Sequence, residues 1–193
     1  FCIFFFSGLS ALIYELLWLR HLGLIFGNTV QAAATVLAAY MLGLAAGAYL
    51  VGRFPHLFRR PILIYGLIEA GIGIYALLMP ILFLMVRFSY KILYQHVSDG
   101  SIFLTTVRFF FGLLILVIPT SMMGATLPIL SRYLLRYNMG FGRRFGFLYG
   151  INTLGAVFGL ILCGFYLIPL VGIKVTNGIA VCLNLVIAGI AIF

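Results

Sequence analysis

Acidic side chains are nearly absent from this sequence, which contains only Glu15, Glu69 and Asp99 among its 193 residues. Charged residues of both signs make up 8% of the chain, whereas a soluble domain usually carries about 25%. Hydrophobic residues reach 65%, with a mean hydropathy of +1.25. This composition excludes a water-soluble domain and indicates an integral membrane protein that contacts a lipid bilayer.

Motifs for metals and cofactors are also lacking. The cysteines Cys2, Cys163 and Cys182 are far apart in apolar runs, where they suit packing. Because the sequence has no CxxC pair, no His–Cys cluster and no histidines four residues apart, it predicts no metal and no cofactor. The formal charge of +9 is not accompanied by a basic, aromatic-rich soluble segment, which argues against a nucleic-acid partner.

Long apolar runs dominate what is present. Six of them suffice to cross a hydrocarbon core about 30 Å thick. They predict an all-α bundle of about six transmembrane helices, forming a single domain over 1–193, with spans at 1–19, 29–51, 62–86, 102–123, 145–168 and 175–193. Tyr14 and Trp18 are expected near a membrane interface, with Arg20 marking the end of the first span. The first residue is Phe1 rather than Met, which is compatible with a fragment of a longer chain.

Basic residues are divided unequally between the two ends of the predicted spans. One end has five: Arg20, Arg87, Lys91, Arg108 and Lys174. The other has seven: Arg53, Arg59, Arg60, Arg132, Arg136, Arg143 and Arg144. Because basic loops favour the cytoplasmic side, these seven predict a cytoplasmic basic face and cytoplasmic termini, as in a bacterial inner-membrane protein. The stretches 87–100 and 131–144 each suit either a short interfacial helix or a solvated loop.

Glycines recur four residues apart in the second and fifth predicted spans. The pairs are Gly43 and Gly47, Gly146 and Gly150, and Gly155 and Gly159. Small faces let helix backbones approach closely in lipid, so we expect these two spans to be the inner, tightly packed helices. The similar strings 43–47 and 159–164 occupy matching positions in two three-helix halves, which suggests a 3+3 repeat.

Polar residues inside the spans are the candidates for a functional site. A carboxylate in an apolar run needs a partner, a water-lined cavity or a proton, which makes Glu15 the best candidate and Glu69 the second. The structural alternative is an ion pair of Glu15 with Arg20 or Arg108. Asn152 and Thr153 either line the same polar site or form hydrogen bonds between helices. Pro119 and Pro128 should bend or interrupt the fourth span.

Several strings along the chain resemble one protein family. They are SGLSALIYELLWLR at 7–20, TVLAAYMLGLAAGA at 35–48, PTSMMGATLP at 119–128, LYGINTLGAVFG at 148–159 and GFYLIPLVG at 164–172. Together they resemble the membrane part of the fused, transporter-like spermidine synthases. The resemblance implies a bundle similar to half of a major-facilitator transporter. In that family the bundle is often joined to a soluble domain resembling an aminopropyltransferase, which uses decarboxylated S-adenosylmethionine and a polyamine.

The sequence departs from that family in having no soluble domain, no glycine-rich cofactor loop and no acidic pair for a diamine. No catalytic residue is therefore carried over. The leading interpretation is a non-catalytic membrane domain or accessory subunit that anchors or organises partner subunits, or a second copy, in a membrane complex. One alternative is a transporter for polyamines or another small organic cation. Another is the membrane anchor of an aminopropyltransferase whose soluble domain lies outside this sequence.

Charge reversal in the basic loops tests the anchoring interpretation. Replacing Arg143 and Arg144 together by Glu should reduce the amount of partner protein that co-purifies, because repulsion would replace a complementary contact. The measurement is quantitative co-purification from membranes, with a cysteine-accessibility assay to show that the topology is unchanged. Equal recovery of the partner with the variant would remove the docking interpretation.

Overall fold

The computed structural model describes residues 2–27, 30–54, 60–95, 102–135 and 141–193. Their secondary structure is helical throughout: α1 (Cys2–Phe26), α2 (Val30–Arg53), α3 (Pro61–Tyr94), α4 (Ile102–Leu135), α5 (Phe141–Ile161), the π-helix η2 (Leu162–Leu167) and α6 (Ile168–Ile192). Five helical segments among these residues are long and apolar enough to cross a membrane. The expected all-helical class is confirmed, and these segments fit an integral membrane protein.

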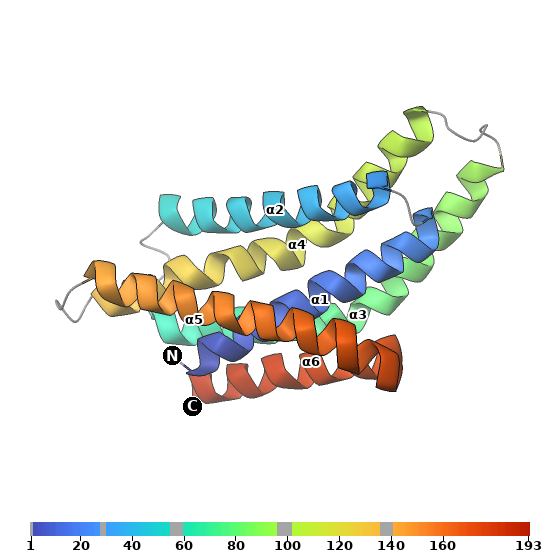
Figure 1. The fold of residues 1–193 in the computed structure, drawn as a ribbon. Coiled ribbons are helices and arrows are strands. Elements are labelled where there is room, and N and C mark those ends of the chain that lie inside the picture. The colour runs from blue at the N-terminus through green and yellow to red at the C-terminus, as the bar shows by residue number, and fades with distance from the viewer. Residues whose placement is uncertain (1, 28–29, 55–59, 96–101, 136–140) are drawn as a thin grey trace.

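The last apolar segment, Gly142–Ile192, is 51 residues long and folds back on itself. Figure 1 shows α5 running away from the end that holds both termini and α6 returning toward it. The reversal occurs at η2 and Gly172, whose φ of 79° lies in the left-handed region that glycine adopts without strain. Residues 169–174, which separate the fifth and sixth predicted spans, thus form a bend within a helical segment.

Several helices extend beyond their predicted ends. α1 continues past Arg20 and His21 to Phe26. The His21 ring is accommodated in the helix because it stacks on Phe83 at 4.9 Å and lies 3.0 Å from the Leu17 carbonyl oxygen. The half-buried ring therefore packs against α3 instead of marking the end of the helix.

α3 and α4 also exceed expectation, with 34 residues each. Residues 87–94 are the last turns of α3, so a separate interfacial helix beginning at Arg87 is wrong. At 1.5 Å per residue each helix is about 51 Å long, well beyond the hydrocarbon core. Figure 1 shows their shared end projecting past α1 and α2.

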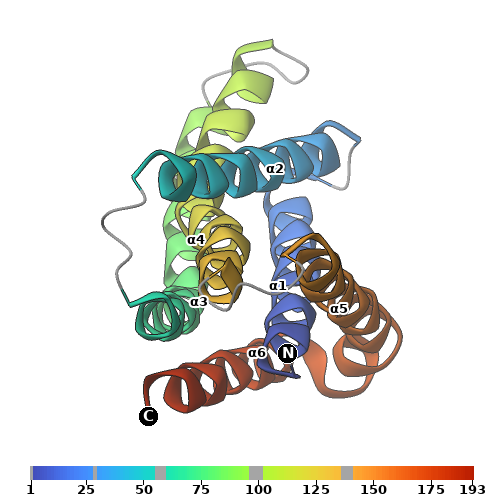
Figure 2. The ribbon, with the colours of Figure 1, turned by 90° about the vertical axis from the view of Figure 1, so that its left-hand side faces the viewer.

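α1 is the central helix of the bundle. It contacts α2, α3, α4, α5 and α6, and Figure 2 shows it between α5 on one side and α3 and α4 on the other. α2 packs chiefly against α4, α5 against α1, and α3 against α6. The expectation that the second and fifth spans are the inner helices is wrong, because most of α5 and much of α2 are exposed.

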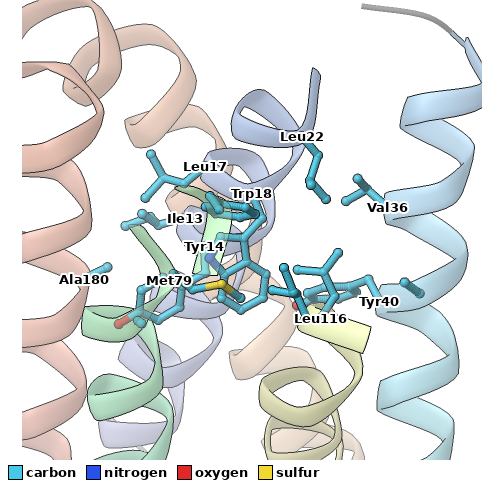
Figure 3. Close-up of a cluster of buried hydrophobic side chains, with 14 of the residues drawn as sticks. Ile13, Tyr14, Leu17, Trp18, Leu22, Val36, Tyr40, Met79, Leu116 and Ala180 are labelled. Carbon is cyan, nitrogen blue, oxygen red and sulfur yellow. The ribbon is translucent and has the colours of Figure 1, made fainter. Parts of the chain in front are cut away.

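The largest buried side chains surround the middle of α1 (Figure 3). Tyr14 and Trp18 stack at 5.5 Å between ring centres and are 0% and 1% exposed. Their expected position at a membrane interface is therefore wrong. The physical reason is the central place of α1, which leaves the face that carries them without access to lipid.

Glycine allows two helix pairs to touch through their backbones. A Cβ at Gly47 of α2 would collide with the Ser121 carbonyl of α4, and one at Gly155 of α5 with the Phe5 carbonyl of α1. Gly43 and Gly159 make similar approaches, to the Thr120 side chain and the Leu9 carbonyl respectively. In contrast, a Cβ at Gly146 or Gly150 would meet nothing within 4 Å, so these two glycines do not belong to the packing face.

Prolines inside helices do not interrupt them. Pro119 lies within continuous α4 and leaves the Ile115 carbonyl, four residues earlier, without its usual backbone donor. The Tyr75 hydroxyl of α3 donates to that carbonyl at 2.9 Å. Asn177 of α6 does the same at 3.1 Å for the Ala76 carbonyl, four residues before Pro80 of α3. The expected interruption of the fourth span is avoided because neighbouring helices supply the missing donors.

Substitution of a contact glycine tests the backbone packing. Gly155→Ala should lower the free energy of unfolding by about 1–3 kcal/mol, because the new methyl group forces α5 away from α1. The measurement is a denaturant titration in detergent micelles. Gly150→Ala on the same helix is the matched control, and it should be neutral or slightly stabilising because alanine favours helix. Equal losses in the two variants would contradict this account.

Candidate functional site

Glu69 is a fully buried carboxyl group held by side chains from two other helices. The Ser7 hydroxyl of α1 donates to its Oε1 at 2.5 Å, and the Asn184 amide of α6 donates to its Oε2 at 2.8 Å. Gly66 and Gly73 of α3 lie against α6, and a Cβ at Gly73 would be 3.4 Å from that of Asn184. Small residues on α3 thus bring α6 within hydrogen-bonding reach, and Glu69 ties α1, α3 and α6 together.

A cavity of about 440 Å³ lies beside this cluster. All six α-helices contribute to its wall, and the described polar residues that line it are Ser7, Ser10, Glu15, Tyr40, Glu69, Thr126, Tyr149, Asn152, Thr153 and Asn184. Four of the five residues predicted as an intramembrane polar site, Glu15, Glu69, Asn152 and Thr153, are therefore brought to one cavity. The fifth, Arg20, is exposed and lines a different groove.

Glu15 lies on the same helix as Ser7, two turns or about 12 Å further along it. Its side chain is half-buried and makes no hydrogen bond or ion pair with the described residues. Arg108, one of the proposed ion-pair partners, instead donates from Nε to the Tyr90 hydroxyl at 2.8 Å. In the described part of the chain, the structural alternative of an ion pair with Arg20 or Arg108 is not found.

Asn152 and Thr153 differ in what they contact. The Asn152 amide of α5 donates to the Phe4 carbonyl of α1 at 3.0 Å, close to the position where Gly8 lets the two backbones meet. The Thr153 hydroxyl bonds to the Tyr149 carbonyl of its own helix at 2.9 Å. Asn152 therefore joins two helices and also borders the cavity.

Among the described residues, two buried polar atoms near Glu69 make no hydrogen bond of normal geometry. They are the Asn184 Oδ1 and the Tyr65 hydroxyl oxygen, in residues that are 1% and 0% exposed. Asn184 is among the residues that line the cavity, and this oxygen is buried at the edge of that wall. A buried acceptor without a partner costs about 1–3 kcal/mol, which favours occupancy by a hydrogen-bond donor.

Sequence reasoning missed Ser7 and Tyr65 beside Glu69, and it also missed four polar residues in the wall of the cavity: Ser10, Tyr40, Thr126 and Tyr149. Tyr65 could have been found, since it lies one turn before Glu69 and shares its helix face. Ser7 carries no such signal, because its contact with Glu69 crosses 62 residues of sequence.

The electrostatic character of the cavity is acidic. Two carboxyl groups line it, and no Lys, Arg or His is among the described lining residues. Hydroxyl and amide groups supply the remaining polar surface. Such a site suits a cationic ligand, and because it offers oxygen ligands it has no preference for the softer metals.

The predicted cytoplasmic basic face is described only in part. Arg53, Arg60 and Arg143 are exposed, and Arg144 is half-buried. Arg132 donates to the Val51 carbonyl at 3.1 Å and so stabilises the C-terminal end of α2. Arg59 and Arg136 lie outside the described residues.

Comparison of the chain with protein-family models, with curated proteins and with solved structures gave no match. The acidic cavity and the helices that build it therefore carry the functional argument.

Truncation of Glu69 tests its role as a link between helices. Glu69→Ala should lower the free energy of unfolding by about 2 kcal/mol or more, because two buried donors, on Ser7 and Asn184, lose their acceptor. Glu69→Gln keeps the shape, and its amide can donate to the free Asn184 Oδ1, so it should retain most of the stability. Glu15→Ala is the control, with little expected effect on unfolding in detergent. Equal losses for Glu15→Ala and Glu69→Ala would rule out the specific role of Glu69.

Proposed function

We propose that this chain is a non-catalytic membrane domain of a transport type, and that its acidic cavity binds a small organic cation, such as a polyamine. The observation that carries the proposal is the meeting of Glu15 and Glu69 in one cavity whose described lining has no basic residue. A carboxylate at membrane depth is costly unless it is compensated. A ligand with two ammonium groups would compensate both acids.

The cavity has the acceptors that an ammonium group requires. An ammonium donates up to three hydrogen bonds and accepts none. The two carboxyl groups and the free Asn184 Oδ1 are acceptors from different helices. A volume of about 440 Å³ lies within the usual range for small-molecule sites. The offset of about 12 Å along α1 between Ser7, which holds Glu69, and Glu15 suits an extended ligand with two positive charges.

An inverted 3+3 repeat is part of the proposal, and the packing register supports it. Residues of α1 and α4 correspond at a constant difference in residue number: Phe5, Gly8 and Ser10 correspond to Ser121, Gly124 and Thr126. Residues of α5 and α2 correspond at a second constant difference, which matches Asn152 and Gly155 with Leu44 and Gly47.

The contacts agree with these two correspondences. A Cβ at Gly8 meets the Asn152 carbonyl and one at Gly124 the Leu44 carbonyl, just as Gly155 meets Phe5 and Gly47 meets Ser121. Ser10 and Thr126 each bond to the carbonyl three residues earlier. In this alignment of α2 with α5, Gly47 corresponds to Gly155. The strings 43–47 and 159–164, which look similar in sequence, therefore do not occupy equivalent positions in the two halves.

Counting α5 and α6 as separate crossings, the proposal gives six spans and half of a two-halved, major-facilitator-like pathway. A second copy or a related subunit would complete it. The resemblance to the membrane part of spermidine-synthase-like proteins agrees with a polyamine ligand. The basic residues at the end that holds both termini support a cytoplasmic position for the termini, in a bacterial inner membrane.

Anchoring of a partner protein is the second candidate function. It is favoured by the exposed Arg53, Arg60 and Arg143, which lie at the end of the bundle that holds both termini. The partner would be a membrane subunit, or an aminopropyltransferase domain if the complete protein carries one. Cation binding and anchoring are compatible, since they use opposite charges at different places on the chain.

Spermidine binding to the protein in nanodiscs tests the proposed ligand class. Glu15→Gln and Glu69→Gln should each weaken binding by about tenfold or more, because each removes a charge-assisted hydrogen bond. Isothermal titration calorimetry gives the affinities. Arg20→Gln, which changes a charge outside the cavity, is the control and should bind as the unaltered protein does. Undetectable binding to the unaltered protein, or equal weakening in all three variants, would overturn the proposal.

A further inference from the structure

A basic pocket lies at the end of the bundle opposite the termini, remote from the acidic cavity. Its volume is about 400 Å³, and it is enclosed by the C-terminal end of α1, the last turns of α3 and one residue of α4. Arg87, Lys91 and Arg108 line it, with no acidic residue among the described residues of its wall. These are three of the five basic residues at this end of the bundle. No opposing charge accompanies them in the described part of the wall, which favours an anionic ligand.

Arg108 is fixed in position at the pocket. Its Nε and Nη2 donate to the Tyr90 hydroxyl at 2.8 and 2.6 Å, and its guanidinium carbon lies 5.4 Å from the centre of the Tyr90 ring. Tyr90 is itself held edge-on against Phe26 of α1 at 5.2 Å. A guanidinium has five N–H donors, so three remain for an anion. Such a preoriented fork suits phosphate oxygens.

The apolar surroundings distinguish a lipid phosphate from a free one. Leu24 is 74% exposed and belongs both to the pocket and to an adjoining groove of about 820 Å³. Leu16, Leu19 and Ile168 contribute apolar wall to that groove. A free phosphate ion would gain nothing from these side chains. A ligand that joins a phosphate to acyl chains would place the phosphate in the basic pocket and an acyl chain in the groove.

We propose that the basic pocket binds the phosphate headgroup of an anionic phospholipid, with an acyl chain along the adjoining groove of α1. α3 and α4 are longer than the hydrocarbon core, and the proposal places the end they share at headgroup level. Arg108 supplies the oriented donors, and Arg87 and Lys91 supply charge. The lipid joins the end of α1 to the projecting ends of α3 and α4. This proposal is independent of the cation site.

Native mass spectrometry of the full chain, released from mixed phosphatidylglycerol and phosphatidylcholine, tests the site. The unaltered protein should retain phosphatidylglycerol in preference to phosphatidylcholine. Retention should fall about fivefold for each cation removed, in Arg108→Gln and in Lys91→Gln. Arg108→Lys keeps the charge but loses the fork, so it should fall between the unaltered protein and Arg108→Gln. Arg143→Gln, at the other end of the bundle, is the matched control and should retain lipid normally.

Three results would overturn the proposal. Equal retention of the two lipids, or equal loss in Arg143→Gln, would mean that the lipid is held without the pocket. Displacement of phosphatidylglycerol by millimolar inorganic phosphate would mean that the pocket serves the free ion. Circular dichroism of each variant establishes that it is folded. Tyr90→Phe, which removes the hydroxyl that orients Arg108, should weaken retention while keeping all three charges.

Discussion

Helices in lipid gain no hydrophobic attraction for one another, and this bundle is organised around the close backbone contact that replaces it. α5 lies on α1, and α2 on α4, at positions where a glycine faces a main-chain carbonyl. These two interfaces leave α1 in the centre and the remaining faces of α2 and α5 on the outside of the bundle. Buried polar groups then find partners only where this fixed geometry brings one within reach. Tyr75 and Asn177 satisfy carbonyls freed by proline, and Ser7 and Asn184 satisfy Glu69.

The acidic cavity follows from the same geometry. Because α1 is central, the cavity that Ser7 and Glu15 line is also bordered by residues from every other α-helix. Glu69 is committed to hydrogen bonds, whereas Glu15 is half-buried and has no partner among the described residues. The two acids thus differ in environment while sharing one space. The cavity therefore contains one carboxyl group that is fixed by hydrogen bonds and one that is not.

The sequence predicts the helical class and most span positions because apolar length is read directly from composition. It also identifies Glu15 and Glu69, since a carboxyl group in an apolar run is unusual wherever it lies. Which helix is central is not encoded locally: the glycines of α2 and α5 mark close contact but not burial. Tyr14 and Trp18 have the composition of interfacial anchors, and only the surrounding helices reveal that they are core residues. The Ser7 contact with Glu69 is likewise a product of tertiary packing.

Where a glycine meets a main-chain carbonyl of the neighbouring helix, the two sides of the contact are chemically unequal. On one side the residue must lack a side chain, whereas on the other the contact is a carbonyl, which every residue type possesses. Phe5, Leu9, Leu44 and Ser121 present that carbonyl, and their side chains are not what the glycine touches. Amino-acid substitution in this architecture is therefore constrained on one side of each such contact only. The residue that presents the carbonyl can change type while the helix spacing stays the same. Two chains with this packing therefore need share little sequence beyond the spacing of their glycines.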